Sequence, residues 1–92
     1  MFRARDVAQW MAQQLARYGR LSHREAVGGI MSQFGVEFLY RNERGNPVIT
    51  KDVLREFRDL TSGAANWDKR HRRWNMLRVA VEQDSYNRSD LI

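Results

Sequence analysis

The chain has 92 residues, no cysteine, a single proline and a formal net charge of +5 at pH 7. A chain of this length forms one domain that is stable without covalent cross-links, and the lack of cysteine excludes disulfides, thiolate metal sites and thiol nucleophiles. Nearly all of the base is arginine, which suits bidentate phosphate contacts but also follows from a GC-rich coding sequence.

The apolar residues are scattered along the chain and form no long run. The sequence turns polar within its first residues, so we expect no signal peptide. No apolar stretch approaches the roughly 18 residues that span a bilayer. We therefore expect a soluble protein of the cytoplasm.

A first helix is predicted over Asp6 to Tyr18, because apolar residues recur there at steps of three and four. Asp6 followed by Gln9 resembles a capping box, and Gly19 stands where a left-handed residue ends a helix. The apolar stripe consists of Val7, Trp10, Met11, Leu15 and Tyr18.

A second helix is predicted to begin at the cap Ser22 and to stop at Gly35. Ser22 and Glu25 have the spacing of a reciprocal capping box. Gly28 and Gly29 lie in the middle of this helix, where each glycine costs on the order of 1 kcal/mol relative to alanine. We favour close packing against another element over a flexible joint as the reason for the pair.

A β-hairpin is predicted from strands at Val36–Arg41 and Pro47–Thr50, which are rich in β-branched and aromatic residues. Asn42 to Gly45 fits a type I turn followed by a left-handed glycine. Both faces carry apolar residues, so we expect other elements to cover each side. Proline donates no backbone hydrogen bond, so the second strand should lie at an edge or begin at Pro47. The expected register pairs Leu39 with Ile49, Tyr40 with Val48 and Phe38 with Thr50.

A third helix is predicted from the cap Thr50 to Ser62 and Gly63, with Asp52 in its first turn. Its inward residues are Val53, Leu54, Phe57 and Leu60. Its outer face balances Lys51, Arg55 and Arg58 against Asp52, Glu56 and Asp59, with Arg55 and Asp59 at ion-pair spacing. A face without net charge disfavours the docking of this helix on phosphates.

A fourth helix is predicted to begin at Asn66 or Asp68 and to carry Trp67, Trp74 and Leu77. Its charge sets it apart, since the stretch from residue 69 to residue 78 contains no acid. The cations in this stretch are Lys69, Arg70, Arg72, Arg73 and Arg78. After it, Val79 to Val81 fits either a continued helix or a short strand, and the segment 83–92 has the composition of a frayed tail.

Two interpretations of the basic segment remain open. In the first interpretation, the arginines hold phosphates while an indole stacks on a base. Five phosphate contacts would then give a slope of log K against log salt of about −4.5. Alternatively, Trp67, Trp74 and Leu77 pack over the face formed by Phe38 and Tyr40, and the arginines stay in solvent. The two interpretations are compatible, because a buried tryptophan stripe still displays the arginines outward.

The inventory of catalytic groups is small. His23 has no serine or acid at a spacing that implies a proton relay, and His71 lies among cations that disfavour its protonation. No HExxH or CxxC motif and no acidic cluster is present. We therefore predict no catalytic, metal or cofactor site, and a protein that is not an enzyme.

The run EFLYRNERGNPVITKDVLREFRDLT, with DVAQWM before it and WDKRHRRW after it, resembles small uncharacterised bacterial proteins with winged-helix-like folds, including products of integron gene cassettes. The resemblance covers about Asp6 to Trp74. It implies a winged-helix-like fold and brings no activity, ligand or functional residue. Since the one hairpin that we expect lies between the second and third helices, the second helix would stand in the position of a recognition helix.

We therefore predict an α+β domain over residues 1–82, winged-helix-like, with three to four helices around a β-hairpin and a C-terminal tail over 83–92. The predicted function is that of a non-enzymatic binding module that contacts a protein partner or its own copy, with no membrane and no small-molecule substrate. The expected interface consists of Phe38, Tyr40, Trp67 and Trp74. The alternative is nucleic-acid binding through Lys69, Arg70, Arg72, Arg73 and Arg78, joined by Arg41 and Arg44 at the hairpin tip.

Overall fold

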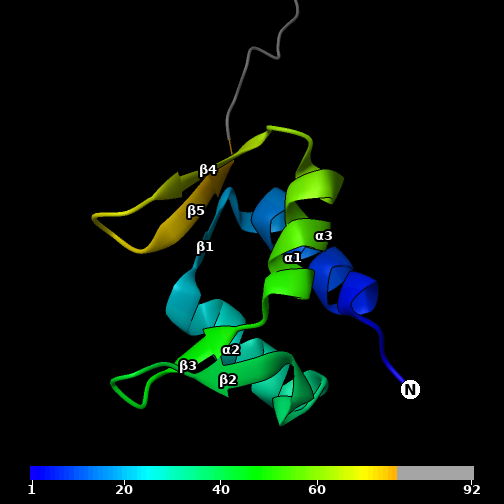
Figure 1. Ribbon diagram of the computed structural model, residues 1–92. Coiled ribbons are helices and arrows are strands. Elements are labelled where there is room, and N and C mark those ends of the chain that lie inside the picture. Colours follow the sequence, from blue (N-terminus) through cyan, green and yellow to red (C-terminus); the bar gives the residue numbers. More distant parts are fainter. Residues whose placement is uncertain (77–92) are drawn as a thin grey trace, which may run out of the picture.

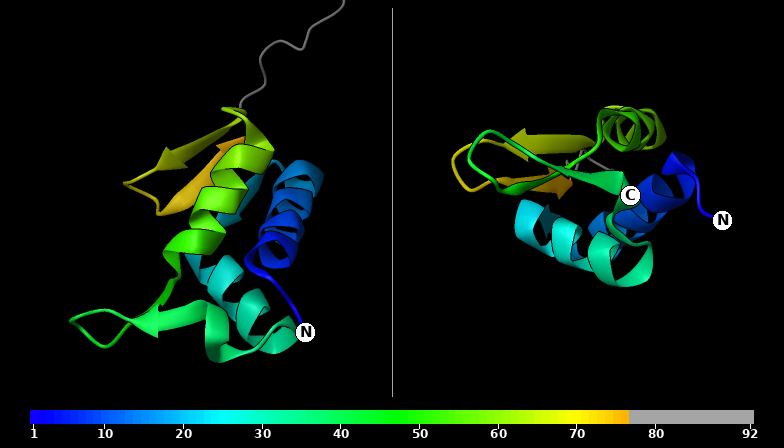
Figure 2. Two further views of the ribbon diagram at one scale, coloured as in Figure 1. Left: turned by 45° about the vertical axis from the view of Figure 1, so that its right-hand side comes forward. Right: turned by 60° about the horizontal axis from the view of Figure 1, so that its bottom comes forward.

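The computed structural model describes residues 1–76 as an α+β domain with three α-helices, one short 3-10 turn and two small antiparallel sheets (Figure 1). The elements are α1 (Ala4–Tyr18), β1 (Arg20–Ser22), α2 (His23–Gln33), η1 (Val36–Phe38), β2 (Leu39–Arg41), β3 (Pro47–Ile49), α3 (Lys51–Thr61), β4 (Ala65–Asp68) and β5 (Arg73–Met76). Helices α1 and α3 lie side by side, and the sheet of β1, β5 and β4 packs across them (Figures 1 and 2). The predictions for Leu77, Arg78, Val79 to Val81 and the segment 83–92 lie outside the described residues.

Helix α1 begins two residues before the predicted start. The backbone N–H of Arg3 donates to the Asp6 carboxylate at 2.7 Å, so Asp6 caps from the third helical position and the predicted capping box with Gln9 is wrong. The end of the helix is confirmed. Gly19 has a φ of 78° and its N–H donates to the carbonyl of Leu15, which is the left-handed end that glycine adopts without a Cβ clash.

Helix α2 confirms the predicted capping box. The Ser22 hydroxyl accepts from the Glu25 N–H at 3.0 Å, and the Glu25 carboxylate accepts from the Ser22 N–H at 3.1 Å. The last helical residue is Gln33, and Gly35 follows with a φ of 93°. The preceding strand β1 has only three residues, too few to show a strand period, and it was not predicted.

The first hairpin confirms the predicted register of Leu39 with Ile49 and Tyr40 with Val48. Gly45 has a φ of 81° and its N–H donates to the Asn42 carbonyl at 2.9 Å, as the bulged turn requires. β3 begins at Pro47, as expected. The predicted first half of the first strand is wrong, because Val36–Phe38 forms a 3-10 turn.

The 3-10 turn changes the role of Phe38. It turns this side chain into the core, where 8% of its surface is exposed. Phe38 still meets Thr50 through one backbone bond, from the Thr50 N–H to the Phe38 carbonyl at 3.0 Å.

The predicted fourth helix is wrong. Residues Ala65–Asp68 and Arg73–Met76 form a second hairpin, β4 and β5, in which Trp67 lies opposite Trp74. The Asp68 carboxylate accepts from the backbone N–H groups of Arg70 and His71, so the candidate helix cap instead closes a turn. β5 lies between β1 and β4, and this pairing satisfies backbone groups that a helix would have bonded internally.

The core lies where α1, α2, α3 and β3 meet. Its largest fully buried side chains are Val7, Met11, Leu15, Ile30, Ile49 and Val53. On α3, Val53 and Phe57 are buried as predicted, while Leu54 and Leu60 are half-buried. The expected pair of Arg55 with Asp59 is not among the ion pairs of residues 1–76, and Glu56 instead binds Arg5 of α1 at 3.0 Å.

Of the two glycines in α2, only Gly29 lies in close contact with another element. A Cβ on Gly29 would overlap the indole ring of Trp10, whereas a Cβ on Gly28 would meet no atom within 4 Å. Close packing of α2 against α1 therefore explains Gly29, as predicted. Nothing in the structure explains Gly28.

The two glycines give a matched test of this packing. Gly28→Ala should stabilise the fold by about 1 kcal/mol through helix propensity. Gly29→Ala should lose that gain because the new methyl displaces Trp10, a change that costs about 1 to 3 kcal/mol. Urea unfolding measures both free energies of unfolding. Equal stabilities for the two variants would contradict the close contact.

Candidate functional site

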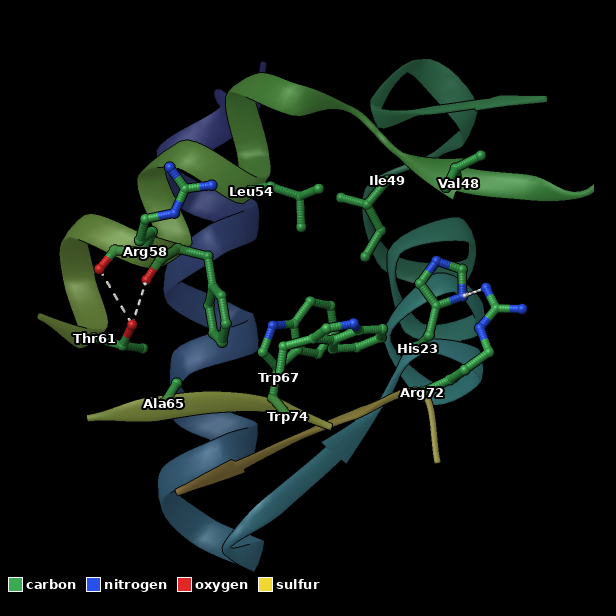
Figure 3. Close-up of a pocket in the computed structure, with 11 residues that line it drawn as sticks. His23, Val48, Ile49, Leu54, Arg58, Thr61, Ala65, Trp67, Arg72 and Trp74 are labelled. Carbon is green, nitrogen blue, oxygen red and sulfur yellow. Dashed lines mark hydrogen bonds between the residues drawn. The ribbon is translucent and has the colours of Figure 1, made fainter. Parts of the chain in front are cut away.

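A pocket of about 600 Å³ opens between α3, β3, the second hairpin and the start of α2 (Figure 3). This volume lies in the usual range for small-molecule sites. The pocket is lined by His23, Val48, Ile49, Leu54, Phe57, Arg58, Thr61, Ala65, Trp67, Arg72 and Trp74.

An aromatic wall forms one side of the pocket. Trp74 contacts Phe57 edge to face with the ring centroids 5.2 Å apart, and Trp67 lies 4.7 Å from Trp74. Phe57 is 3% exposed and Trp67 is 41% exposed, so the wall runs from the core to the solvent. Leu54 and Ile49 lie opposite the indoles (Figure 3).

The polar side chains of the pocket are mainly basic. Arg58 lies near Thr61 at one end, and His23 and Arg72 lie together near Val48 at the other (Figure 3). None of the pocket-lining residues within the described part of the chain is an aspartate or a glutamate. The pocket therefore combines an apolar interior with a positive potential.

His23 and Arg72 are joined by backbone and side chain. The His23 N–H donates to the Arg72 carbonyl at 2.9 Å, and an Arg72 guanidinium nitrogen lies 3.4 Å from His23 Nδ1. Burial of the ring, and secondarily the charge of Arg72, lower the pKa of His23. A neutral imidazole can accept from the guanidinium at Nδ1 and keeps a donor at Nε2.

The turn between β4 and β5 carries a concentration of positive charge. Lys69, Arg70 and Arg72 are exposed, and Arg73 is half-buried. The nearby carboxylate is that of Asp68, and it is engaged inside the turn.

The Asp68 carboxylate binds His71 Nδ1 at 2.8 Å in addition to the two backbone N–H groups of the turn. The hydrogen bond from His71 is the main cause of a lowered pKa at Asp68. The lowered pKa keeps Asp68 ionised, and its carboxylate also lies 4.0 Å from Arg73 Nε. Lys69, Arg70 and Arg72 are exposed beside this single acid, so the turn keeps an excess of positive charge.

The tip of the first hairpin lies on the same side of α3 as this basic turn (Figure 2). Arg41 donates to the Gly45 carbonyl at 2.6 Å, and Arg44 is exposed at the tip. Glu43 lies between the two arginines. The two hairpin turns thus flank one face of the molecule, but the first of them is the less basic.

The predicted interface residues do not form one surface. Phe38 is buried in the core, Trp74 packs on Phe57, and Tyr40 and Trp67 are exposed. Trp74 therefore packs on α3 and Trp67 on Trp74, and the pocket that they line includes neither Phe38 nor Tyr40. Sequence reasoning missed the pocket and the part that Arg58 plays in it, because no local pattern signals a cavity built from four separate elements.

Among residues 1–76, no group of three or more His, Cys, Asp and Glu side chains is placed to hold a metal ion. Over the same range, no helix has the length and apolar character needed to cross a membrane.

Comparison with known proteins identifies a family. Residues 3–76 match the family described as a family of unknown function, DUF6953, and the chain belongs to that family. No curated protein and no solved structure matches the chain.

The lowered pKa of His23 predicts a pH dependence of folding. Above about pH 6.5 the histidine is neutral in both the folded and the unfolded chain. As the pH falls below that value the unfolded chain is protonated first, so stability decreases until the folded pKa is reached. His23→Gln should remove this part of the decrease, measured as the difference in unfolding free energy between variant and wild type from pH 8 to pH 5. A difference that stays constant over that range would count against a buried, neutral His23.

Proposed function

We propose that this member of DUF6953 is a non-enzymatic domain that binds nucleic acid through the turn of its second hairpin. The observation that carries the proposal is the exposure of Lys69, Arg70 and Arg72 on one turn whose acid, Asp68, is hydrogen-bonded internally. Exposed cations in excess of the carboxylate beside them attract phosphates, and each phosphate contact releases counterions. The proposed location of this binding is the cytoplasm, with which the lack of cysteine is compatible.

The order of elements supports a winged-helix relationship of a different kind from that expected. A winged-helix domain places its recognition helix directly before its wing. The second hairpin follows α3 directly, and β1, β5 and β4 form a single sheet. We therefore assign α3 to the recognition position and β4–β5 to the wing, and we treat the β2–β3 hairpin as an insertion after α2.

The charge of α3 argues for sequence-independent binding. Its exposed Asp52 and Asp59 would meet phosphates if the helix entered a groove, and the repulsion and desolvation of these carboxylates would oppose docking. The turn itself reaches out from the body of the domain (Figure 1). The proposal is therefore contact with the sugar–phosphate backbone, with little reading of base edges.

A second candidate is association with a protein partner or with a second copy of the chain. Two exposed side chains at and next to the first hairpin favour it: Tyr40 of β2 is 46% exposed, and Val36 of η1 is 69% exposed. Large apolar side chains held in water are common at interfaces. This candidate uses a surface different from the basic turn, so the two can be tested separately.

The nucleic-acid proposal predicts a salt-dependent affinity. Titration of duplex DNA, single-stranded DNA and RNA at about 50 and 200 mM salt should show binding that weakens steeply with salt. The double variant Lys69→Ala/Arg70→Ala should bind more weakly and reduce the slope of log K against log salt by about 2.

The matched control removes the same charge elsewhere. Arg3→Ala/Arg17→Ala changes exposed cations in or next to α1, which lies across α3 from both hairpin turns (Figure 2). This control should keep most of the slope. Equal losses in the two double variants, or no binding at low salt, would remove the proposal.

The second candidate predicts a mass that rises with concentration. Sedimentation equilibrium up to about 1 mM detects weak dimers, whose dissociation constants lie in that range. Tyr40→Ser should lower the association without lowering the melting temperature, because the side chain is exposed. A chain that stays monomeric throughout would count against self-association.

A further inference from the structure

We infer that the pocket between α3, β3 and the second hairpin is a binding site for a small organic acid, whose flat apolar body lies against Trp67 and Trp74 and whose carboxylate is held by Arg72 and His23. The inference goes beyond the proposed function, because it concerns a different ligand and does not require Lys69 or Arg70.

The apolar body is indicated by the walls of the pocket. Trp67 and Trp74 present their rings on one side, and Leu54 and Ile49 lie across from them (Figure 3). Aromatic rings 4.7 Å apart and open to solvent leave apolar area that a flat ligand would remove from water. A pocket of about 600 Å³ accommodates such a molecule.

The carboxylate is indicated by the polar end next to Val48. Figure 3 shows the Arg72 side chain rising from the hairpin to His23, with the contact between them marked. A guanidinium with a neutral imidazole beside it offers a charged fork and a further N–H donor. The pocket lining within residues 1–76 contains no acid that would compete for these groups.

The backbone of Arg72 supports a role for its side chain. Its φ of 52° is left-handed, a conformation that glycine and asparagine adopt more readily than arginine. Closing the turn does not require an arginine at this left-handed position. The arginine does, however, place its guanidinium against His23.

The charges of the pocket favour an anionic ligand over a cationic or a neutral one. A cation would be repelled by Arg58 and Arg72, and a neutral molecule would leave the charged fork without an acceptor. A carboxylate on an apolar body satisfies both ends of the pocket.

The test uses three probes with one naphthalene body. The acid 2-naphthoate, the neutral 2-naphthamide and the cation 2-naphthylmethylammonium are titrated up to about 5 mM into the ¹⁵N-labelled full chain, a range that detects millimolar affinity. The indole N–H signals of Trp67 and Trp74 should move with 2-naphthoate. The signal of Trp10, which packs on α2 outside this pocket, should stay in place. The acid should bind at least about tenfold more tightly than the amide.

Three variants locate the carboxylate. Arg72→Asn introduces a residue that adopts the left-handed turn more readily, so the variant should be at least as stable as the wild type while its affinity for 2-naphthoate falls to that for the amide. Arg44→Ala removes the same charge at the tip of the first hairpin, outside the pocket, and should change the affinity less than about twofold. Lys69→Ala/Arg70→Ala should keep acid binding, which separates this site from the nucleic-acid surface.

The titration of His23 provides a second measurement of binding. Binding of 2-naphthoate should raise the pH at which the His23 ring signals titrate, because a bound carboxylate favours the imidazolium. Equal affinity for acid and amide, equal losses in Arg72→Asn and Arg44→Ala, or unmoved Trp67 and Trp74 signals would each overturn the inference.

Discussion

The pairing of β5 with β1 joins the second hairpin to the segment between α1 and α2, and the rest of the fold depends on it. Leu21 pairs with Trp74, and the ladder is extended at both ends, by the Met76 N–H to the Gly19 carbonyl and by the His23 N–H to the Arg72 carbonyl. These bonds join segments about fifty residues apart in sequence. They fix the second hairpin against the start of α2, and in doing so they create both the aromatic wall and the contact of Arg72 with His23.

The second hairpin serves two surfaces at once. Its strands carry the tryptophans toward α3, and its turn carries Lys69 and Arg70 away from the body of the domain. Asp68 lies between the two surfaces, and its carboxylate accepts hydrogen bonds that hold the turn. Arg72 stands at the boundary, with its backbone in the turn and its side chain at the pocket.

Local chemistry made part of this structure predictable from sequence. The Ser22 and Glu25 cap, the Asn42 to Gly45 turn and the register it imposes are decided by residues within a few positions of each other. The second hairpin was not predictable in the same way. Trp67 and Trp74 are seven residues apart, a spacing that fits two turns of a helix as well as a cross-strand pair. Asp68 likewise suits a helix cap or a turn. Only the long-range partner β1 decides between the two, and a strand of three residues leaves no pattern to find. The pocket depends on the same long-range pairing.

The left-handed backbone of Arg72 places folding stability in opposition to the ligand recognition that we infer for this residue. Asparagine or glycine would relax the turn, so a screen of variants for heat resistance alone would favour replacing this arginine. Such a stabilised protein would retain its hairpin, its tryptophans and most of its charge. It would also lack the guanidinium beside His23, so selection for heat resistance would tend to remove the group to which we assign anion binding.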